Sequence, residues 1–168
     1  SKAKILVTAS CGYEPSRTVH YKPLVNKALE LANHKPEKCI IFQREKDKAD
    51  LNPKIDITWE DAHKGAKSTE CEKMNSNDYA YILYTSGTTG LPKGIVRDIG
   101  GHIVALKWTM KNIYNIEPDD VWWSASDIGW IVGHSYIVYA PLFYGCTTVL
   151  FEGKPVGTPD AGVFWRII

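Results

Sequence analysis

The sequence carries almost no net charge, because 20 lysine and arginine residues are balanced by 19 aspartate and glutamate residues, for a formal charge of +1. A nucleic-acid surface or a polybasic membrane patch requires a clustered excess of basic residues. The charge balance therefore gives no sign of a nucleic-acid surface, and we expect no nucleic-acid partner. Any phosphate-bearing ligand must be held by local geometry and not by a global field.

Paired cysteines are also missing. The sequence has four cysteines, Cys11, Cys39, Cys71 and Cys146, and no two of them are in a C-x-x-C spacing. No histidine cluster accompanies them, so the spacings that are typical of zinc sites are absent. We therefore expect free thiols, some of them buried, and no metal site.

The segment between Asp127 and Glu152 contains no Asp, Glu, Lys or Arg. It is long enough to span a bilayer, but Pro141 followed by Gly145 is typical of a helix end and a turn. We expect a buried helix followed by a buried strand, and no membrane span. Residues 1–4 lead straight into an apolar run and lack the features of a signal peptide.

Apolar runs and helical spacings alternate along the chain, which predicts an α/β fold with a mainly parallel sheet flanked by helices. Proline at position 23 favours the start of a helix, and Thr58 with Asp61 resembles a capping box. The expected strands are residues 4–9, 39–42, 79–84, 94–97, 121–125 and 147–151. The expected longer helices are residues 23–32, 103–113 and 133–143, with Val104, Leu106, Trp108 and Ile113 as core candidates in the second. Residues 10–12 are expected to turn, and residues 44–54 and 64–77 to form surface loops.

The last residues, from Ala161 to Ile168, begin an apolar helical pattern and stop without a cap or a polar tail. A natural terminus rarely ends on an uncapped apolar pair. We therefore expect this chain to be a fragment of a longer protein.

The stretch from Tyr84 to Gly94 contains Thr85, Ser86, Thr88 and Thr89 together with three glycines and Lys93. Glycines admit close backbone approach and positive φ, hydroxyls donate hydrogen bonds, and a lysine adds positive charge. These are the groups that a polyphosphate-binding loop needs. An alignment with G-x-x-x-x-G-K-[ST] fails at Pro92 and Gly94, which lose a backbone donor and the Mg²⁺-binding hydroxyl. The G-x-G step of the dinucleotide-binding motif is also missing.

The string from Thr85 to Gly94 instead resembles the signature T-S-G-[ST]-T-G-x-P-K-G of the adenylate-forming superfamily. Residues 127–136 resemble the motif D-[VI]-G-W-[VI]-x-G-H-S-Y of its short-chain acyl-CoA synthetases. Residues 154–162 are most similar to the propionyl-CoA synthetases among them, the animal mitochondrial type in particular. The resemblance covers nearly the whole chain, with residues 44–77 loosely matched, and implies that residues 1–168 are part of an AMP-binding domain truncated at both ends.

This resemblance implies activation of a short-chain carboxylic acid by ATP with Mg²⁺, followed by transfer to coenzyme A. The phosphate-binding residues would be Thr85, Ser86, Gly87, Thr88, Thr89, Gly90 and Lys93. Lys93 would either add charge for catalysis or anchor the loop. The mobile carboxy-terminal domain with its catalytic lysine would lie downstream of Ile168, so the isolated chain is expected to be inactive.

Trp130, Ile131 and Val132 stand at positions that border the acyl pocket in this family, and Val132 and Val156 would lie near CoA. Similar acetyl-CoA synthetases usually have threonine at the position of Val132, so valine makes the site more apolar and favours propionate over acetate. All three pocket candidates could equally be core residues. His134 is expected to shape the structure, because a carboxylate nucleophile is already ionised at neutral pH and needs no base.

Three alternatives remain open from the sequence: an acetate–CoA ligase, a non-catalytic nucleotide-binding fragment, and another branch of the superfamily, such as the luciferase-like enzymes. The resemblance to animal proteins implies the mitochondrial matrix, and otherwise the cytoplasm. The oligomeric state does not follow from the sequence.

Overall fold

Two units make up the chain: residues Ser1–Thr69 with Gly153–Ile168, and residues Glu70–Glu152. A computed structural model describes residues 2–87, 90–154 and 157–168. We call the two parts the first unit and the second unit, and describe each by itself.

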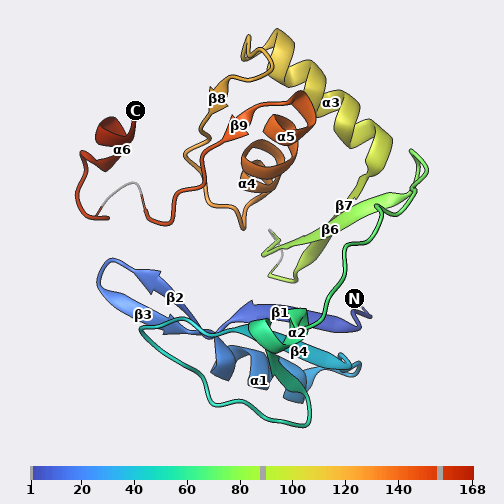
Figure 1. The fold of residues 1–168 in the computed structure, drawn as a ribbon, viewed down its shortest axis with the longest axis vertical. Helices are drawn as coiled ribbons and strands as arrows, with labels where there is room; N and C mark the ends of the chain where they lie inside the picture. Colours follow the sequence, from blue (N-terminus) through green and yellow to red (C-terminus); the bar gives the residue numbers. More distant parts are fainter. Residues whose placement is uncertain (1, 88–89, 155–156) are drawn as a thin grey trace. The chain divides into compact units, whose positions relative to one another are not determined.

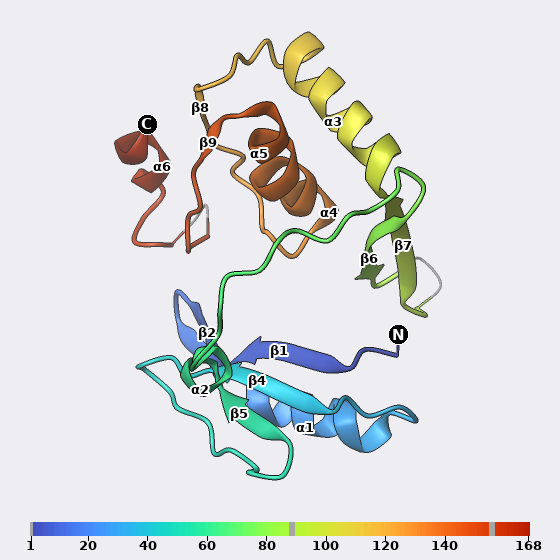
Figure 2. The same ribbon diagram turned by 45° about the vertical axis from the view of Figure 1, so that its right-hand side comes forward.

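The first unit is built on a parallel sheet in the order β1-β4-β5, which consists of Ile5–Ala9, Lys38–Phe42 and Asp56–Thr58. Helix α1, Tyr21–Leu31, lies along this sheet (Figures 1 and 2). Leu6 pairs with Cys39 and Thr8 with Ile41, and Cys39 and Ile41 are fully buried. The predicted strand–helix–strand unit with parallel strands is confirmed.

Two local predictions for the first unit need correction. The chain does not simply turn after Ala9, because β2, Cys11–Glu14, forms an antiparallel hairpin with β3, Arg17–His20. Helix α1 begins at Tyr21, so Pro23 lies in its first turn, where a missing N–H costs nothing.

The predicted cap is confirmed: Thr58 Oγ1 accepts a hydrogen bond of 3.0 Å from the backbone N–H of Asp61 at the start of α2, Trp59–His63. A short last helix, α6, covers Val163–Ile167.

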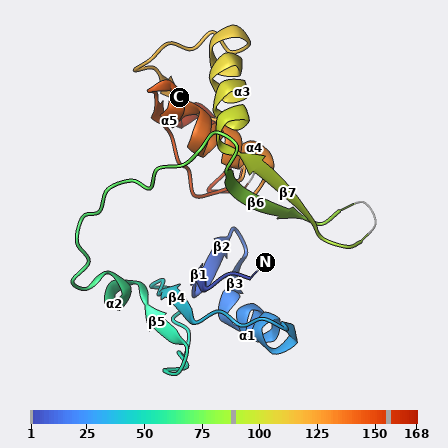
Figure 3. The same ribbon diagram turned by 90° about the vertical axis from the view of Figure 1, so that its right-hand side faces the viewer.

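The second unit begins with an antiparallel hairpin of β6, Tyr79–Thr85, and β7, Lys93–Asp98. Helix α3, Ile99–Asn112, follows directly (Figure 3), capped by the Asp98 carboxylate, which accepts a 2.7 Å hydrogen bond from Gly101 N. A continuous helical segment consists of α4, Ile131–Gly133, the π-helical turn η1, His134–Tyr139, and α5, Ala140–Tyr144. Strands β8, Val121–Trp122, and β9, Thr147–Thr148, pair in parallel.

The core of the second unit lies between α3 and α5 and contains Leu106, Met110, Ala140 and Cys146. Trp122 packs against this core and donates its indole N–H to the carbonyl of Tyr136 over 2.6 Å. Three of the four expected core positions of α3 are wrong, since Val104, Trp108 and Ile113 are exposed. The buried face follows the spacing of His102, Leu106 and Met110 instead.

The stretch without charged residues forms the expected helical segment, but the expected buried strand over residues 147–151 is wrong, since β9 covers only Thr147–Thr148 and Thr147 is exposed. None of the helices within the described ranges combines the length and the apolar character needed to cross a membrane.

Candidate functional site

The predicted phosphate loop joins the two strands of the β6–β7 hairpin, where Thr85 pairs with Lys93. Gly87 has a φ of +62°, and a Cβ atom there would overlap the carbonyl oxygen of Leu91. A side chain at position 87 would therefore force the loop open. Figure 3 shows the loop at the end of the hairpin that points away from α3.

The described loop residues are available to a ligand. Ser86, Gly90 and Lys93 are exposed, and Thr85 is half-buried at the end of β6. The side-chain stem of Lys93 lies beside Gly87, so the anchoring role predicted for this lysine is geometrically open to it. The predictions for Thr88 and Thr89 fall outside the described residues, as does the prediction for Val156.

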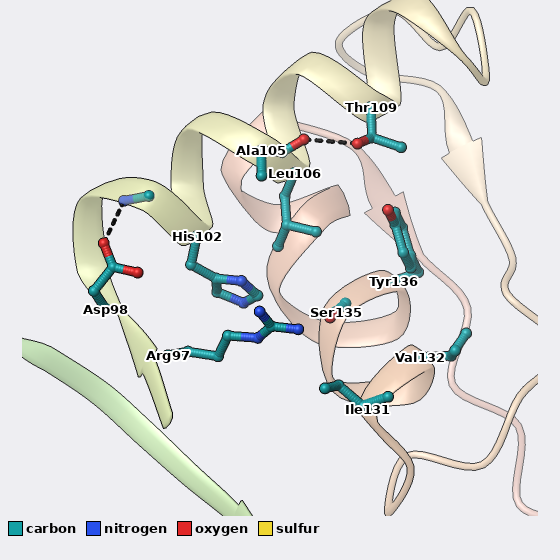
Figure 4. A pocket seen from close by; sticks show the side chains of 11 residues that line it. Arg97, Asp98, His102, Ala105, Leu106, Thr109, Ile131, Val132, Ser135 and Tyr136 are labelled. Atoms are coloured by element: carbon teal, nitrogen blue, oxygen red, sulfur yellow. Dashed lines mark hydrogen bonds between the residues drawn. The ribbon is translucent and has the colours of Figure 1, made fainter. Parts of the chain in front are cut away.

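A cavity of about 500 Å³ lies at the opposite end of β7, between this strand, α3 and the segment formed by α4 and η1 (Figure 4). Arg97 lies four positions after Lys93 along β7, which corresponds to roughly 13 Å in an extended strand. The cavity is lined by Arg97, Asp98, Gly101, His102, Ala105, Leu106, Thr109, Ile131, Val132, Ser135 and Tyr136.

The structure brings two of the three predicted acyl-pocket residues into this cavity. Ile131 and Val132 line it, whereas Trp130 does not and is 65% exposed as the N-cap residue of α4. Gly133 fixes this helix close to the preceding turn, because a Cβ atom there would overlap the backbone of Asp127 and Ile128. The glycine thereby determines where Ile131 and Val132 stand.

Arg97 and His102 form one wall of the cavity, and no sequence motif predicted either residue. His102 is buried, and no described residue forms a hydrogen bond with its Nε2; the same holds for the buried Nε of the half-buried Arg97. Burial, and next the charge of Arg97, lower the pKa of His102, while Asp98 opposes the shift. His102 is therefore a neutral imidazole at neutral pH.

Aromatic rings pack around His102 and hold its ring in place. Tyr81 and Tyr139 stack with ring centroids 5.3 Å apart, and the His102 ring meets them edge-on at 5.5 and 5.4 Å. His134 packs on Tyr81 at 5.5 Å, and its Nδ1 lies 3.3 Å from the carbonyl oxygen of Trp130. These contacts give His134 the packing role that we expected.

One sequence signal could have identified His102. It stands four residues before Leu106 and eight before Met110, on the face of α3 that the apolar residues bury. A histidine on such a face needs a hydrogen-bond partner or a neutral state. No comparable signal marks Arg97, since a charged residue near the end of a strand usually faces solvent.

Cys11, Cys39 and Cys146 are buried free thiols, and Cys71 is an exposed one. Burial raises the pKa of Cys39 and of Cys146, which keeps both thiols protonated at neutral pH. Within the described part of the chain, no group of three or more His, Cys, Asp or Glu side chains could hold a metal ion.

Known proteins resemble the chain over its whole length. The AMP-binding enzyme family matches residues 1–168. Human "Acyl-CoA synthetase short-chain family member 3, mitochondrial" is 54% identical over 168 residues, which cover 99% of this chain and 24% of that protein. An uncharacterized protein of Pseudomonas aeruginosa is 54% identical over 165 residues, covering 98% of this chain and 26% of its own.

Among solved structures, the acetoacetyl-CoA synthetase from Streptomyces lividans superposes with a TM-score of 0.80 at 26% identity. The match covers 98% of this chain and 24% of that one. The chain therefore spans about a quarter of the length of the relatives it matches.

Proposed function

The chain belongs to the AMP-binding enzyme family, and from this premise we propose that the whole protein is an AMP-forming ligase that joins a short-chain carboxylic acid, with propionate favoured, to coenzyme A. ATP, the acid and coenzyme A are its substrates, and Mg²⁺ arrives as part of the MgATP substrate. Residues 1–168 are proposed as a partial adenylation domain of that protein.

The reaction has two steps. A carboxylate oxygen of the acid attacks the α-phosphorus of ATP, the bond from this phosphorus to the bridging oxygen breaks, and pyrophosphate leaves. The thiol sulfur of coenzyme A then attacks the acyl carbon, and the bond from this carbon to the AMP oxygen breaks. The products are the thioester, AMP and the proton released from the thiol. The first step requires neutralisation of the phosphate charges, so that an anionic acid can approach.

The loop residues are proposed to supply this neutralisation. Hydroxyls of Thr85, Ser86, Thr88 and Thr89, backbone amides at Gly87 and Gly90, and the ammonium of Lys93 would bind the β- and γ-phosphates. Among them, the exposure of Ser86, Gly90 and Lys93 at a hairpin end supports the assignment. The hydrogen-bond donors would meet the phosphates without unfolding any strand.

The observation that carries the proposal is that one hairpin holds both parts of the site. The hydroxyl- and glycine-rich loop stands at one end of β7, and the cavity lined by Ile131 and Val132 stands at the other. An acid in the cavity and the polyphosphate on the loop would approach each other along this strand. Val132 would border both the acyl group and the incoming CoA thiol, and Val156 is proposed as a second residue near CoA.

The preference for propionate rests on Val132, whose side chain presents methyl groups where a threonine would present a hydroxyl. One additional methylene in an apolar pocket is worth roughly 1–3 kcal/mol. We therefore expect kcat/KM for propionate to exceed that for acetate by about tenfold or more.

Isotope exchange between pyrophosphate and ATP tests the first step in the whole protein. The exchange should depend on added propionate, and Lys93→Ala should slow it by about 100-fold, in line with the loss of a transition-state charge contact. Lys111→Ala, which removes a charge from α3 outside the cavity, is the matched control and should leave the rate unchanged. If the exchange rate does not depend on added acid, the proposed ligase function is wrong.

Other outcomes identify the alternatives. A higher kcat/KM for acetate than for propionate would identify an acetate–CoA ligase, and ATP binding without any exchange would identify a non-catalytic nucleotide-binding protein. We also propose the mitochondrial matrix, because the human relative is named a mitochondrial protein, although the Pseudomonas relative at equal identity is bacterial. Cell fractionation with a matrix marker tests the location, with the cytoplasm as the contrary result.

A further inference from the structure

The cavity has one polar wall and one apolar wall. Arg97 and His102 supply the polar side, and Figure 4 shows the Arg97 side chain extending between His102 and Ile131 toward Ser135. Ala105, Leu106, Ile131 and Val132 supply the apolar side. An amphipathic ligand therefore fits this cavity better than a wholly apolar or a wholly polar one.

The polar wall carries the positive charge of Arg97, beside the carboxylate of Asp98 in the same lining. Arg97 is half-buried, and among the described residues it has neither an ion-pair nor a side-chain hydrogen-bond partner. The neighbouring carboxylate of Asp98 is engaged by Gly101 N at 2.7 Å, at the N-terminus of α3. The buried Nε of Arg97 has lost water without gaining a partner, which costs free energy. An anionic group bound in the cavity would supply that partner.

His102 points to the same ligand independently of Arg97. His102 is only 7% exposed, and its Nε2 lacks a partner within the described part of the chain. A neutral imidazole can place its proton on Nε2 and donate it to an oxygen. The ring is held by Tyr81 and Tyr139, so little side-chain freedom would be lost on binding.

We propose that Arg97, assisted by His102, binds the carboxylate of the substrate acid in this cavity, with the alkyl group of the acid against Ile131 and Val132. This inference rests on the proposed function and assigns a substrate-binding residue that neither the loop motif nor the predicted acyl pocket contains. One carboxylate oxygen contacts the guanidinium, and the other stays free to attack ATP. Arg97 therefore determines the affinity for the acid and leaves the affinity for ATP to the loop.

Steady-state exchange kinetics of the whole protein with sodium propionate test the assignment. Arg97→Gln should raise the KM for propionate roughly tenfold or more, which is the loss of one charge-assisted hydrogen bond. Because ATP is proposed to contact the loop and not Arg97, the KM for ATP should change less than about twofold. Arg97→Lys keeps the charge without the fork geometry and should recover part of the affinity. Lys107→Gln, an equal loss of charge from the exposed side of α3, should change neither constant.

Calorimetric titration with sodium propionate, in the presence of an ATP analogue with a methylene bridge between the α- and β-phosphates, gives a reading without turnover. His102→Phe, which retains an aromatic ring, should weaken propionate binding, and n-propanol should not bind in place of propionate. Equal propionate affinity in the wild type and Arg97→Gln would overturn the inference.

The two proposals fail in different ways. If the wild type shows no acid-dependent exchange, the proposed ligase function is wrong, whatever Arg97 does. If the wild type is active but Arg97→Gln shifts the melting temperature and both KM values together, Arg97 pairs with a carboxylate of the protein itself. The substrate assignment is then refuted while the ligase function stands.

Discussion

Each unit contains a cation that is at least half-buried, and the two cations differ in their partners. In the first unit, the Lys22 ammonium, 7% exposed, lies 2.6 Å from the fully buried carboxylate of Asp56 and donates to Asn26 over 2.8 Å. In the second unit, Arg97 has no such anion among the described residues. The Lys22 ammonium therefore has both an anion and a hydrogen-bond acceptor within the first unit, and it lies where α1 packs on the sheet. Arg97 faces a cavity. The contrast separates a cation that stabilises structure from one that can bind a ligand.

The comparison predicts, first, that removing the anion of the first unit is very costly. Asp56→Ala would leave the Lys22 ammonium buried and unpaired, which typically destabilises a protein by about 3–5 kcal/mol. Hydrogen exchange of the β4 amides, Lys38–Phe42, in the native whole protein measures the loss. The double replacement Lys22→Met with Asp56→Leu is the control and should cost much less, because it leaves no charge behind. Equal protection in Asp56→Ala and the wild type would break the comparison.

Protonation of His102, which lies in the second unit, should have a smaller effect. The pKa of His102 is lowered by burial, so the unfolded state binds more protons in the pH range between the lowered and the ordinary value. The contribution of neutral His102 to the free energy of unfolding is complete above about pH 6.5 and decreases as the pH falls below that value. Arg97 adds to the effect and Asp98 opposes it.

Hydrogen exchange of the α3 amides as a function of pH measures this contribution of His102 to stability. His102→Phe should flatten the dependence of α3 protection on pH, whereas His34→Gln, on an exposed residue of the first unit, should not. An identical pH dependence in the wild type and His102→Phe would show that the buried imidazole does not titrate in this range.

The smallest effect is expected where the cation has no partner. Arg97→Gln should change the free energy of unfolding by no more than about 1 kcal/mol in the absence of acid, because no ion pair is lost. Hydrogen-exchange protection of the β7 and α3 amides measures this change. Its comparison with and without sodium propionate separates the effect of the substitution on stability from stabilisation by bound propionate. A loss as large as that of Asp56→Ala would place Arg97 among the structural cations.

The local parts of the fold could be predicted from the sequence because neighbouring residues determine them. The hairpin around Gly87 follows from an apolar strand with glycine and proline after it, and the cap at Thr58 follows from its distance to Asp61. The family prediction is also correct. The roles of the loop and pocket residues stay predictions.

Features that depend on packing between distant segments could not be predicted. The partner of Lys22 is Asp56, on strand β5, which no apolar run in the sequence predicts. Exposure of Val104 and Trp108 depends on which face of α3 meets α5, and helical spacing alone does not decide between faces. Arg97 was missed because its importance comes from the cavity that α3 and α4 form beside it.

The contact between Gly133 and the backbone of Asp127 determines how far the cavity can be redesigned. Positions 131 and 132 have side chains on the cavity wall, so larger or smaller residues there change its volume directly. Position 133 admits no side chain at all, since even a methyl group would push the helix off the turn. Directed evolution toward longer acids should therefore accumulate substitutions at 131 and 132, and leave glycine at 133 untouched.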